Sequence, residues 1–332
     1  MSSRRISRKG FAIEIEVPEG LGDRLRAAVG RPPASVDPSR EVVLHAPPPV
    51  RLEPRDPQRA LDFLRDPTLQ GDGAPSPKLL EYTAEAERKL AAATTLAEKV
   101  ALTPWYHTIE LPGGLVTPGS HDHRRLIGHM GFPADLTGMR CLDVATFDGF
   151  WAFELERRGA DVVALDLPST AGLDLPTGAH QIMIDEKLES PFGGGFALAR
   201  EALGSEVTLY QRSVYDLSPE ALGMFDLVFA GDVLLHLERP LEALRRIRSV
   251  TRGTLVLADR YDAELTGRPG RLIGYQGGWR GLEWWRPSLD ALAQMVIDAG
   301  FTDVDIRGVY RLPRTGAKVD LLGWHRAIMH VT

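Results

Sequence analysis

Apolar and polar positions follow a regular pattern in the second half of the chain. From Arg140 onward, short apolar runs alternate with segments of helical spacing. Runs of this kind are typical of strands buried on both faces, and the segments between them are usually helices. The pattern predicts an α/β fold with a mostly parallel sheet and helices on both faces. The runs are Cys141–Val144, Val162–Leu165, Val207–Tyr210, Phe225–Phe229 and Thr254–Leu257.

The end of the chain continues this alternation. Ser288 is a residue type that caps helices, and the helical spacing after it lasts through Ala299. Gly300 can end that helix, and Val304–Ile306 can return to the sheet as a strand. Residues 136–332 are therefore predicted to form one domain, with the topology of a Rossmann-like sheet.

The first part of the chain has a different character. Phe11–Val17 alternates like a short strand, and prolines are frequent from Pro32 to Pro57, as in extended linkers. Between Ser76 and Val100, apolar residues recur at spacings suited to amphipathic helices. We expect residues 1–75 to be a strand and Pro-rich accessory region, and residues 76–135 to be a helical cover and lid.

Composition excludes several classes of function. The chain has 332 residues, a formal net charge of −6 and one cysteine, Cys141, inside an apolar run. A disulfide framework and a multi-cysteine zinc site are thereby excluded. The acidic balance disfavours a large nucleic-acid footprint. Neither a signal peptide nor a membrane-spanning run is evident, so we expect a cytoplasmic protein without a membrane partner.

The most informative segment joins the first predicted strand to a helix. Leu142–Val144 forms the strand, Ala145–Asp148 the turn, and Gly149 precedes the helix. In a parallel sheet this order places a binding crevice at the carboxyl ends of the strands. Asp166 follows the next strand, where a carboxylate can accept hydrogen bonds from both hydroxyls of a ribose.

This turn resembles motif I of class I S-adenosylmethionine-dependent methyltransferases. That motif usually has three alternating glycines, whereas here Ala145 and Phe147 replace the first two and only Gly149 remains. Dinucleotide enzymes need close approach of the backbone to a pyrophosphate, but S-adenosylmethionine has no phosphate and tolerates a bulkier turn. The substitutions therefore favour a methyltransferase over a dehydrogenase. A strand–turn–helix without a ligand is the remaining alternative.

Several further segments together resemble a narrower family, the tRNA wobble-uridine (carboxy)methyltransferase-like proteins, over about residues 100 to 305. The carboxymethylating branch has a lysine and a tyrosine where this chain has His107 and Leu235. Their replacement implies ordinary S-adenosylmethionine as cofactor and simple methyl transfer. The segments are Pro104–His107, Asp148–Trp151, Gly231–His236 with Pro240, and Trp285–Ser288.

The resemblance implies a set of cofactor-binding residues. Ser213 and Val214 match the segment that flanks adenine, and Gly231 lies where the chain approaches the sulfonium. Arg124 falls near a lysine that contacts the cofactor in the family. The full set is Arg124, Asp143, Ala145, Thr146, Gly149, Asp166, Leu167, Ser213, Val214 and Gly231.

Methyl transfer needs a base only when the acceptor atom carries a proton. His107, His236 and Asp232 are the candidate catalytic residues, because they lie in motif-like segments. His121 and His123 are further candidate bases, and a structural histidine is the alternative for each. Neighbouring strand residues point to opposite faces and a third ligand is not evident, so His121-Asp122-His123 is not predicted to bind metal.

Aromatic residues are candidates for the substrate site. Trp105, Tyr106, Trp279 and Trp285 could stack on a planar acceptor, and packing on the sheet is the alternative for each. The leading hypothesis is O-methylation of a small hydroxylated metabolite, natural-product or sugar-like. The alternatives are methylation of a tRNA wobble uridine and a non-catalytic cofactor-binding protein. The sequence leaves a homo-oligomer open.

Overall fold

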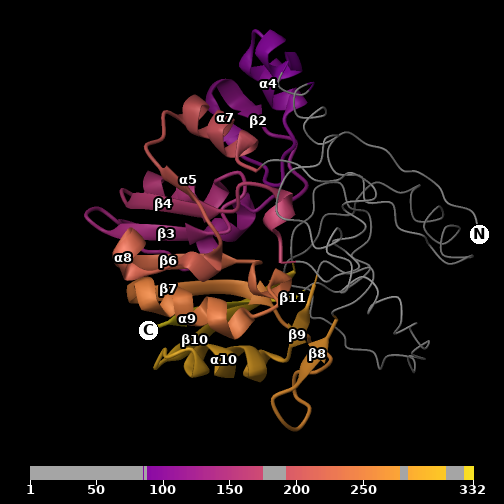
Figure 1. Ribbon diagram of the computed structural model, residues 1–332, viewed down its shortest axis with the longest axis vertical. Helices are drawn as coiled ribbons and strands as arrows, with labels where there is room; N and C mark the ends of the chain where they lie inside the picture. Colours follow the sequence, from indigo (N-terminus) through magenta and orange to yellow (C-terminus); the bar gives the residue numbers. More distant parts are fainter. Residues whose placement is uncertain (1–84, 86–87, 175–191, 277–282, 312–324) are drawn as a thin grey trace, which may run out of the picture.

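The computed structural model describes residues 85, 88–174, 192–276, 283–311 and 325–332. Within them, seven strands form one sheet in the order β10-β11-β7-β6-β3-β4-β5 (Figure 1). The prediction of a Rossmann-like α/β sheet is confirmed. The accessory region predicted at residues 1–75 lies outside the described residues. The strands are β3 (Arg140–Val144), β4 (Asp161–Asp166), β5 (Thr208–Gln211), β6 (Phe225–Gly231), β7 (Thr251–Arg260), β10 (Val304–Arg311) and β11 (His325–Val331).

The direction of the strands divides the sheet into two parts. β5, β4, β3, β6 and β7 are parallel neighbours, whereas β11 is antiparallel to both β7 and β10. β3 lies between β4 and β6, so the strand order reverses beside it. In open α/β sheets this reversal opens a crevice at the carboxyl ends of the strands, where ligands bind.

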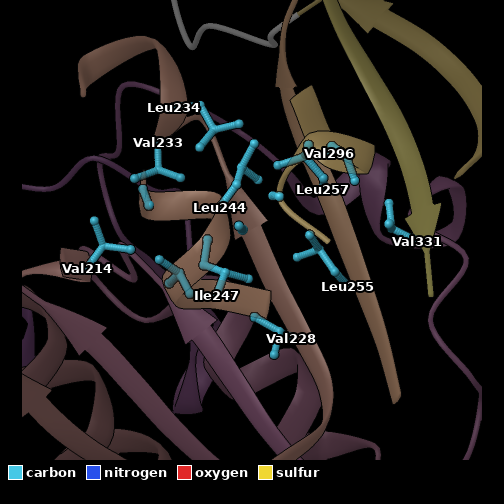
Figure 2. Close-up of a cluster of buried hydrophobic side chains, with 14 of the residues drawn as sticks. Val214, Val228, Val233, Leu234, Leu244, Ile247, Leu255, Leu257, Val296 and Val331 are labelled. Atoms are coloured by element: carbon cyan, nitrogen blue, oxygen red, sulfur yellow. The ribbon is translucent and has the colours of Figure 1, made fainter. Parts of the chain in front are cut away.

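Helices cover both faces of the sheet because side chains alternate along each strand. On β3, Cys141 packs with helices α5 (Phe150–Arg157) and α7 (Gly194–Leu203). Leu142 and Val144 pack on the other face, against α9 (Pro240–Val250) and α10 (Leu289–Asp298). Figure 2 shows the second of these apolar clusters, with Ile247 of α9 and Val296 of α10 facing the strands.

The N-terminal cover lies on the face of α5 and α7. Helix α4 (Leu96–Leu102) begins with a capping box in which the Thr95 hydroxyl accepts from the backbone N–H of Glu98. Val100 and Leu111 pack in the same apolar cluster as Phe196 of α7. The remaining helix and strands are β1 (Glu110–Leu111), β2 (Leu115–Val116), α8 (Pro219–Leu222), β8 (Ile273–Tyr275) and β9 (Trp285–Pro287).

Several sequence predictions agree with these elements, and others differ. Ser288 caps α10 by accepting from the N–H of Ala291, and Gly300 follows that helix with φ of +105°, as predicted. Cys141 is fully buried, and burial raises the pKa of its thiol to about 12. β7 and β10 are longer than predicted because both pair with β11, a strand that the sequence pattern had not indicated. Among the described residues, no helix has the length and apolarity to cross a bilayer.

Candidate active site

A cavity of about 370 Å³ opens at the carboxyl ends of β3, β4 and β6. Its volume lies in the range of small-molecule sites. Its wall contains carboxyl groups at the ends of both β4 and β6, together with aromatic rings and histidines. The lining residues are Tyr106, His107, His123, Asp143, Val144, Ala145, Phe147, Trp151, Leu165, Asp166, Leu167, Gly172, Leu173, Asp174, Phe192, Arg212, Ser213, Val214, Tyr215, Phe229, Gly231, Asp232, Val233, His236, Leu237 and Tyr310.

The turn after β3 has an alternating left-handed backbone. Ala145, Phe147 and Gly149 have φ of 60°, 53° and 89°. These are the three positions at which the motif I resemblance has glycine. A left-handed conformation costs a residue with a Cβ roughly 1–2 kcal/mol. The turn thus keeps a shape that favours glycine although two of its three glycines are replaced.

Gly149 has a steric role in this turn. A Cβ on Gly149 would lie 2.5 Å from the ring of Phe153 and 2.8 Å from that of Phe196. Gly149 is also the residue at which α5 begins, and its carbonyl accepts from the N–H of Phe153. It is not among the lining residues of the cavity. Its position therefore explains how α5 packs under the turn.

We expect Gly149→Ala to destabilise the protein by about 1–3 kcal/mol, because strained backbone and steric overlap add together. Ala145→Gly should leave stability unchanged or raise it slightly, because it relieves the left-handed strain at its own position. Urea unfolding of both variants measures the difference. Equal destabilisation by the two substitutions would contradict this account of the turn.

Asp166 connects the end of β4 to the turn. Its Oδ2 accepts from the N–H of Phe147 at 2.6 Å, and its Oδ1 accepts from the N–H of Leu167 at 2.7 Å. Each oxygen keeps a further lone pair, and the residue lines the cavity. Burial raises the pKa of Asp166 to about 6. Near neutral pH the cavity thus contains a carboxylate that can accept hydrogen bonds from a ligand.

Asp143 is a second carboxyl group in the cavity wall. It is 1% exposed, and burial raises its pKa to about 7. The hydroxyl of Thr146 donates to its Oδ2 at 2.6 Å, and the N–H of Thr146 donates to the carbonyl of Leu165. Thr146 does not line the cavity. Its contacts orient Asp143 and hold the turn against β4.

Asp148 is a site residue to which the sequence had given no role. Its Oδ2 accepts from the backbone N–H groups of Tyr106 and His107, at 2.6 and 2.8 Å. The residue is 4% exposed, and burial raises its pKa to about 7. Asp148 therefore fixes the Tyr106–His107 segment of the N-terminal cover beside the turn.

The segment after β5 lies at the end of the cavity that Asp166 lines. Ser213 caps the 3₁₀ helix Val214–Asp216 by accepting from the N–H of Tyr215 at 3.3 Å. The N–H of Arg212 donates to the carbonyl of Asp166. Ser213 and Val214 thus line the cavity next to Asp166.

At the opposite end, β6 finishes with Gly231 and Asp232. Asp232 has a left-handed φ of 51°, and its carboxylate pairs with Nε of Arg326. The Arg326 side chain is 1% exposed and comes from β11. Behind this pair, Asp259 accepts from the N–H groups of Val233 and Leu234. The end of β6 is therefore held by buried charged groups.

Histidines and aromatic rings form the remaining wall. The Tyr106 ring stacks on His121 at 4.2 Å between centroids, and His123 stacks on Trp151 at 5.7 Å. The rings of His107 and His123 are 5.1 Å apart. Burial lowers the pKa of His107 well below its usual value and that of His123 to about 4. Both imidazoles are consequently neutral near pH 7.

Some predicted site residues lie away from the cavity. Arg124 pairs with Asp122 and Glu110. The indole N–H groups of Trp105 and Trp285 donate to the carbonyls of Val100 and Glu238, respectively. Trp279 lies outside the described residues. Within the described ranges, no three His, Cys, Asp or Glu side chains are grouped to hold a metal ion.

No protein-family model matches the chain. A magnesium-protoporphyrin O-methyltransferase of Rhodobacter capsulatus is 32% identical over 119 residues, which is 36% of this chain and 43% of the relative. The match thus spans less than half of either protein.

Solved structures of methyltransferases also resemble the chain. The N-terminal domain of EvdMO1 with S-adenosylhomocysteine (SAH) bound has a TM-score of 0.48 at 17% identity, covering 79% of this chain and 98% of that one. The 1,6-didemethyltoxoflavin-N1-methyltransferase of Burkholderia thailandensis has a TM-score of 0.41 at 17% identity, covering 85% and 92%. The strand order, with antiparallel β11 between β7 and β10, is that of the class I S-adenosylmethionine-dependent methyltransferase fold.

Proposed function

We propose that the protein is an S-adenosylmethionine-dependent methyltransferase that O-methylates a small hydroxylated molecule. One observation carries this proposal: the left-handed turn after β3 faces Asp166, in a cavity that continues to the histidines and Asp232. The matched O-methyltransferase supports the same reaction class. When bound, S-adenosylmethionine supplies a methyl group activated by a positively charged sulfur.

The chain offers distinct groups for each part of this cofactor. The Asp166 carboxylate would accept hydrogen bonds from the ribose hydroxyls, and Leu167, Ser213 and Val214 would flank the adenine. Gly231 would lie toward the methyl end, with Asp232 beside it. The ribose, adenine and methyl end of the cofactor would thus contact the same residues that the sequence resemblance implies for them.

The acceptor would occupy the end of the cavity with the histidines. Tyr106, His107 and His236 line the cavity, and His107 and His236 are the candidate bases from the sequence. The enzyme would mainly align the acceptor with the methyl group and exclude water. A limited, aromatic-lined cavity favours a small molecule over a macromolecule.

Methylation of a tRNA wobble uridine is the second candidate, supported by the segments that resemble that family. The net charge of −6 disfavours it, because binding to phosphates requires a basic surface. Incubation with methyl-labelled S-adenosylmethionine and separate RNA and small-molecule fractions of the host cell tests both. Label in the small molecules supports the proposal, and label in RNA with steeply salt-dependent affinity supports the alternative. Cofactor binding without any transfer would support the non-catalytic hypothesis.

We expect carboxy-S-adenosylmethionine to bind more weakly than S-adenosylmethionine. His107 is neutral and Leu235 is buried outside the cavity lining, so neither supplies a positive charge to pair with an added carboxylate. Competition titration of the two donors measures the preference. Tighter binding of the carboxylated donor would contradict this expectation.

A further inference from the structure

Two buried imidazoles face the cavity with unsatisfied nitrogen atoms. His123 is 5% exposed and His107 is 4% exposed, and both line the cavity. The described part of the chain supplies no hydrogen-bond partner for either ring nitrogen of His123 or for Nδ1 of His107. That Nδ1 is 3.9 Å from the Asp148 carboxylate, which is too far for a hydrogen bond. Buried polar groups without partners are rare in folded proteins, so these nitrogens are expected to bond to a group inside the cavity, either ordered water or a bound ligand that replaces it.

The chemistry of these nitrogens restricts that ligand. A neutral imidazole has one donor and one acceptor nitrogen, so it is best satisfied by a group that both donates and accepts, such as a hydroxyl. A carboxylate or phosphate only accepts, so it would leave the acceptor nitrogen of each imidazole without a donor. Trp151 and Phe229 line the cavity nearby and suit an apolar or planar body.

We propose that His123 receives the proton of a hydroxyl group on an acceptor that is uncharged at this site, and that His107 hydrogen-bonds the same acceptor. This inference rests on the proposed methyl transfer. His123 lies in no recognised motif, and the sequence had placed it only among the wider set of candidate bases.

The step is balanced in atoms and charge. The hydroxyl oxygen forms a bond to the methyl carbon as the carbon–sulfur bond breaks, and that electron pair goes to sulfur. The hydroxyl proton moves to a ring nitrogen of His123. One positive charge is thus lost at sulfur and one appears on the imidazole, so the net charge of the site stays constant.

The surroundings favour His123 over His107 as the proton acceptor. Burial lowers the pKa of His123 to about 4; the charges of Asp232 and Asp122 act to raise it, and that of Arg326 acts to lower it. Around His107 the resolved charge effects, from His123 and His121, lower its pKa further. Two carboxylates thus favour an imidazolium at His123, whereas the Asp148 oxygen 3.9 Å from Nδ1 of His107 already accepts two backbone N–H groups, so His107 is suited to hold the acceptor.

Substitution of His123 tests the assignment. His123→Ala should lower the rate of labelled methyl transfer to the host small-molecule fraction at least about a hundredfold, as loss of a general base does. The affinity for SAH, measured by calorimetry, should change less than twofold. Added imidazole should restore part of the turnover. His123→Gln, which preserves the size of the side chain, covers the case in which the alanine variant fails to fold. His129→Ala, at an exposed histidine in the same segment, is the matched control and should leave turnover unchanged. Full turnover in a folded His123 variant would overturn the proposal.

The labelled product and the histidine ring provide independent readouts. Product labelled by the host small-molecule fraction should be uncharged and should keep its methyl group in mild alkali, as a methyl ether does. In the SAH complex at pH 7, nitrogen NMR should show His123 as a neutral imidazole. Alkali-released methanol, which indicates a methyl ester, or an imidazolium at His123 would overturn this inference alone. Absence of label from every fraction would overturn the proposed function as well.

Discussion

Asp166→Asn is expected to weaken S-adenosylmethionine binding by about 1.5–3 kcal/mol, which corresponds to a tenfold to hundredfold rise in Kd. The amide nitrogen of asparagine cannot accept a hydrogen bond from a ribose hydroxyl, and in either orientation it meets a backbone N–H, of Phe147 or Leu167. Isothermal titration calorimetry measures the change. Asp166→Ala, which removes both acceptor oxygens, should weaken binding by a similar amount.

Asp161→Asn is the matched control, because Asp161 begins the same strand, far from the cavity, and its side chain is 77% exposed. Its affinity for S-adenosylmethionine should equal that of the unmodified protein. Unchanged affinity in a folded Asp166 variant would show that this carboxylate does not bind the cofactor.

The pH dependence of binding provides a second check on Asp166. Its pKa is raised to about 6 by burial, so the carboxylate is ionised above that pH and gains a proton as pH falls through it. A protonated carboxyl group accepts hydrogen bonds from hydroxyls more weakly, so affinity should fall below about pH 6. Asp143 and Asp148 titrate in the same region. The difference between the unmodified protein and Asp166→Asn isolates the contribution of Asp166.

Asp232→Ala is expected to lower the free energy of unfolding by about 3–5 kcal/mol. The substitution removes the carboxylate that pairs with the buried Arg326 guanidinium and leaves Asp259 as the nearby negative charge, and breaking a buried ion pair is strongly destabilising. The left-handed backbone at this position adds to the cost, because alanine tolerates it less well than aspartate. Urea unfolding measures the loss.

Two further variants identify the cause of that loss. Asp232→Ala combined with Arg326→Met should recover much of the stability, because the buried guanidinium that lost its ion-pair partner is removed as well. Asp305→Ala, which breaks an exposed ion pair with Arg307, should cost less than about 1 kcal/mol. If the single and double variants are equally unstable, the buried pair does not explain the role of Asp232.

The parallel part of the sheet could be predicted because its strands are buried on both faces. Short, continuous apolar runs such as Val162–Leu165, separated by helical segments, are typical of parallel strands in α/β folds. β11 was missed because its continuous apolar run, Ala327–Met329, has only three residues and because its position between β7 and β10 depends on pairing. Arg326 belongs to this strand, so its contact with Asp232 could not be predicted either.

The candidate site, like the sheet, could be predicted only where a local sequence pattern places the residues. The turn and Asp166 could be placed because they follow predicted strands directly. The roles of Asp148 and His123 depend on how the N-terminal cover folds back onto the turn, which no local pattern specifies. Trp105 and Trp285 had the residue type expected of a substrate site, but residue type alone does not distinguish stacking on a ligand from the packing seen here.

A crystal structure of the protein with SAH tests the central claim most directly, because it locates the cofactor product. The account predicts that both ribose hydroxyls lie within hydrogen-bond distance of the Asp166 carboxylate, with adenine beside Val214 and sulfur toward Gly231. It also predicts that the remaining space reaches His107 and His123. SAH bound elsewhere, or oriented with its ribose away from Asp166, would contradict the account.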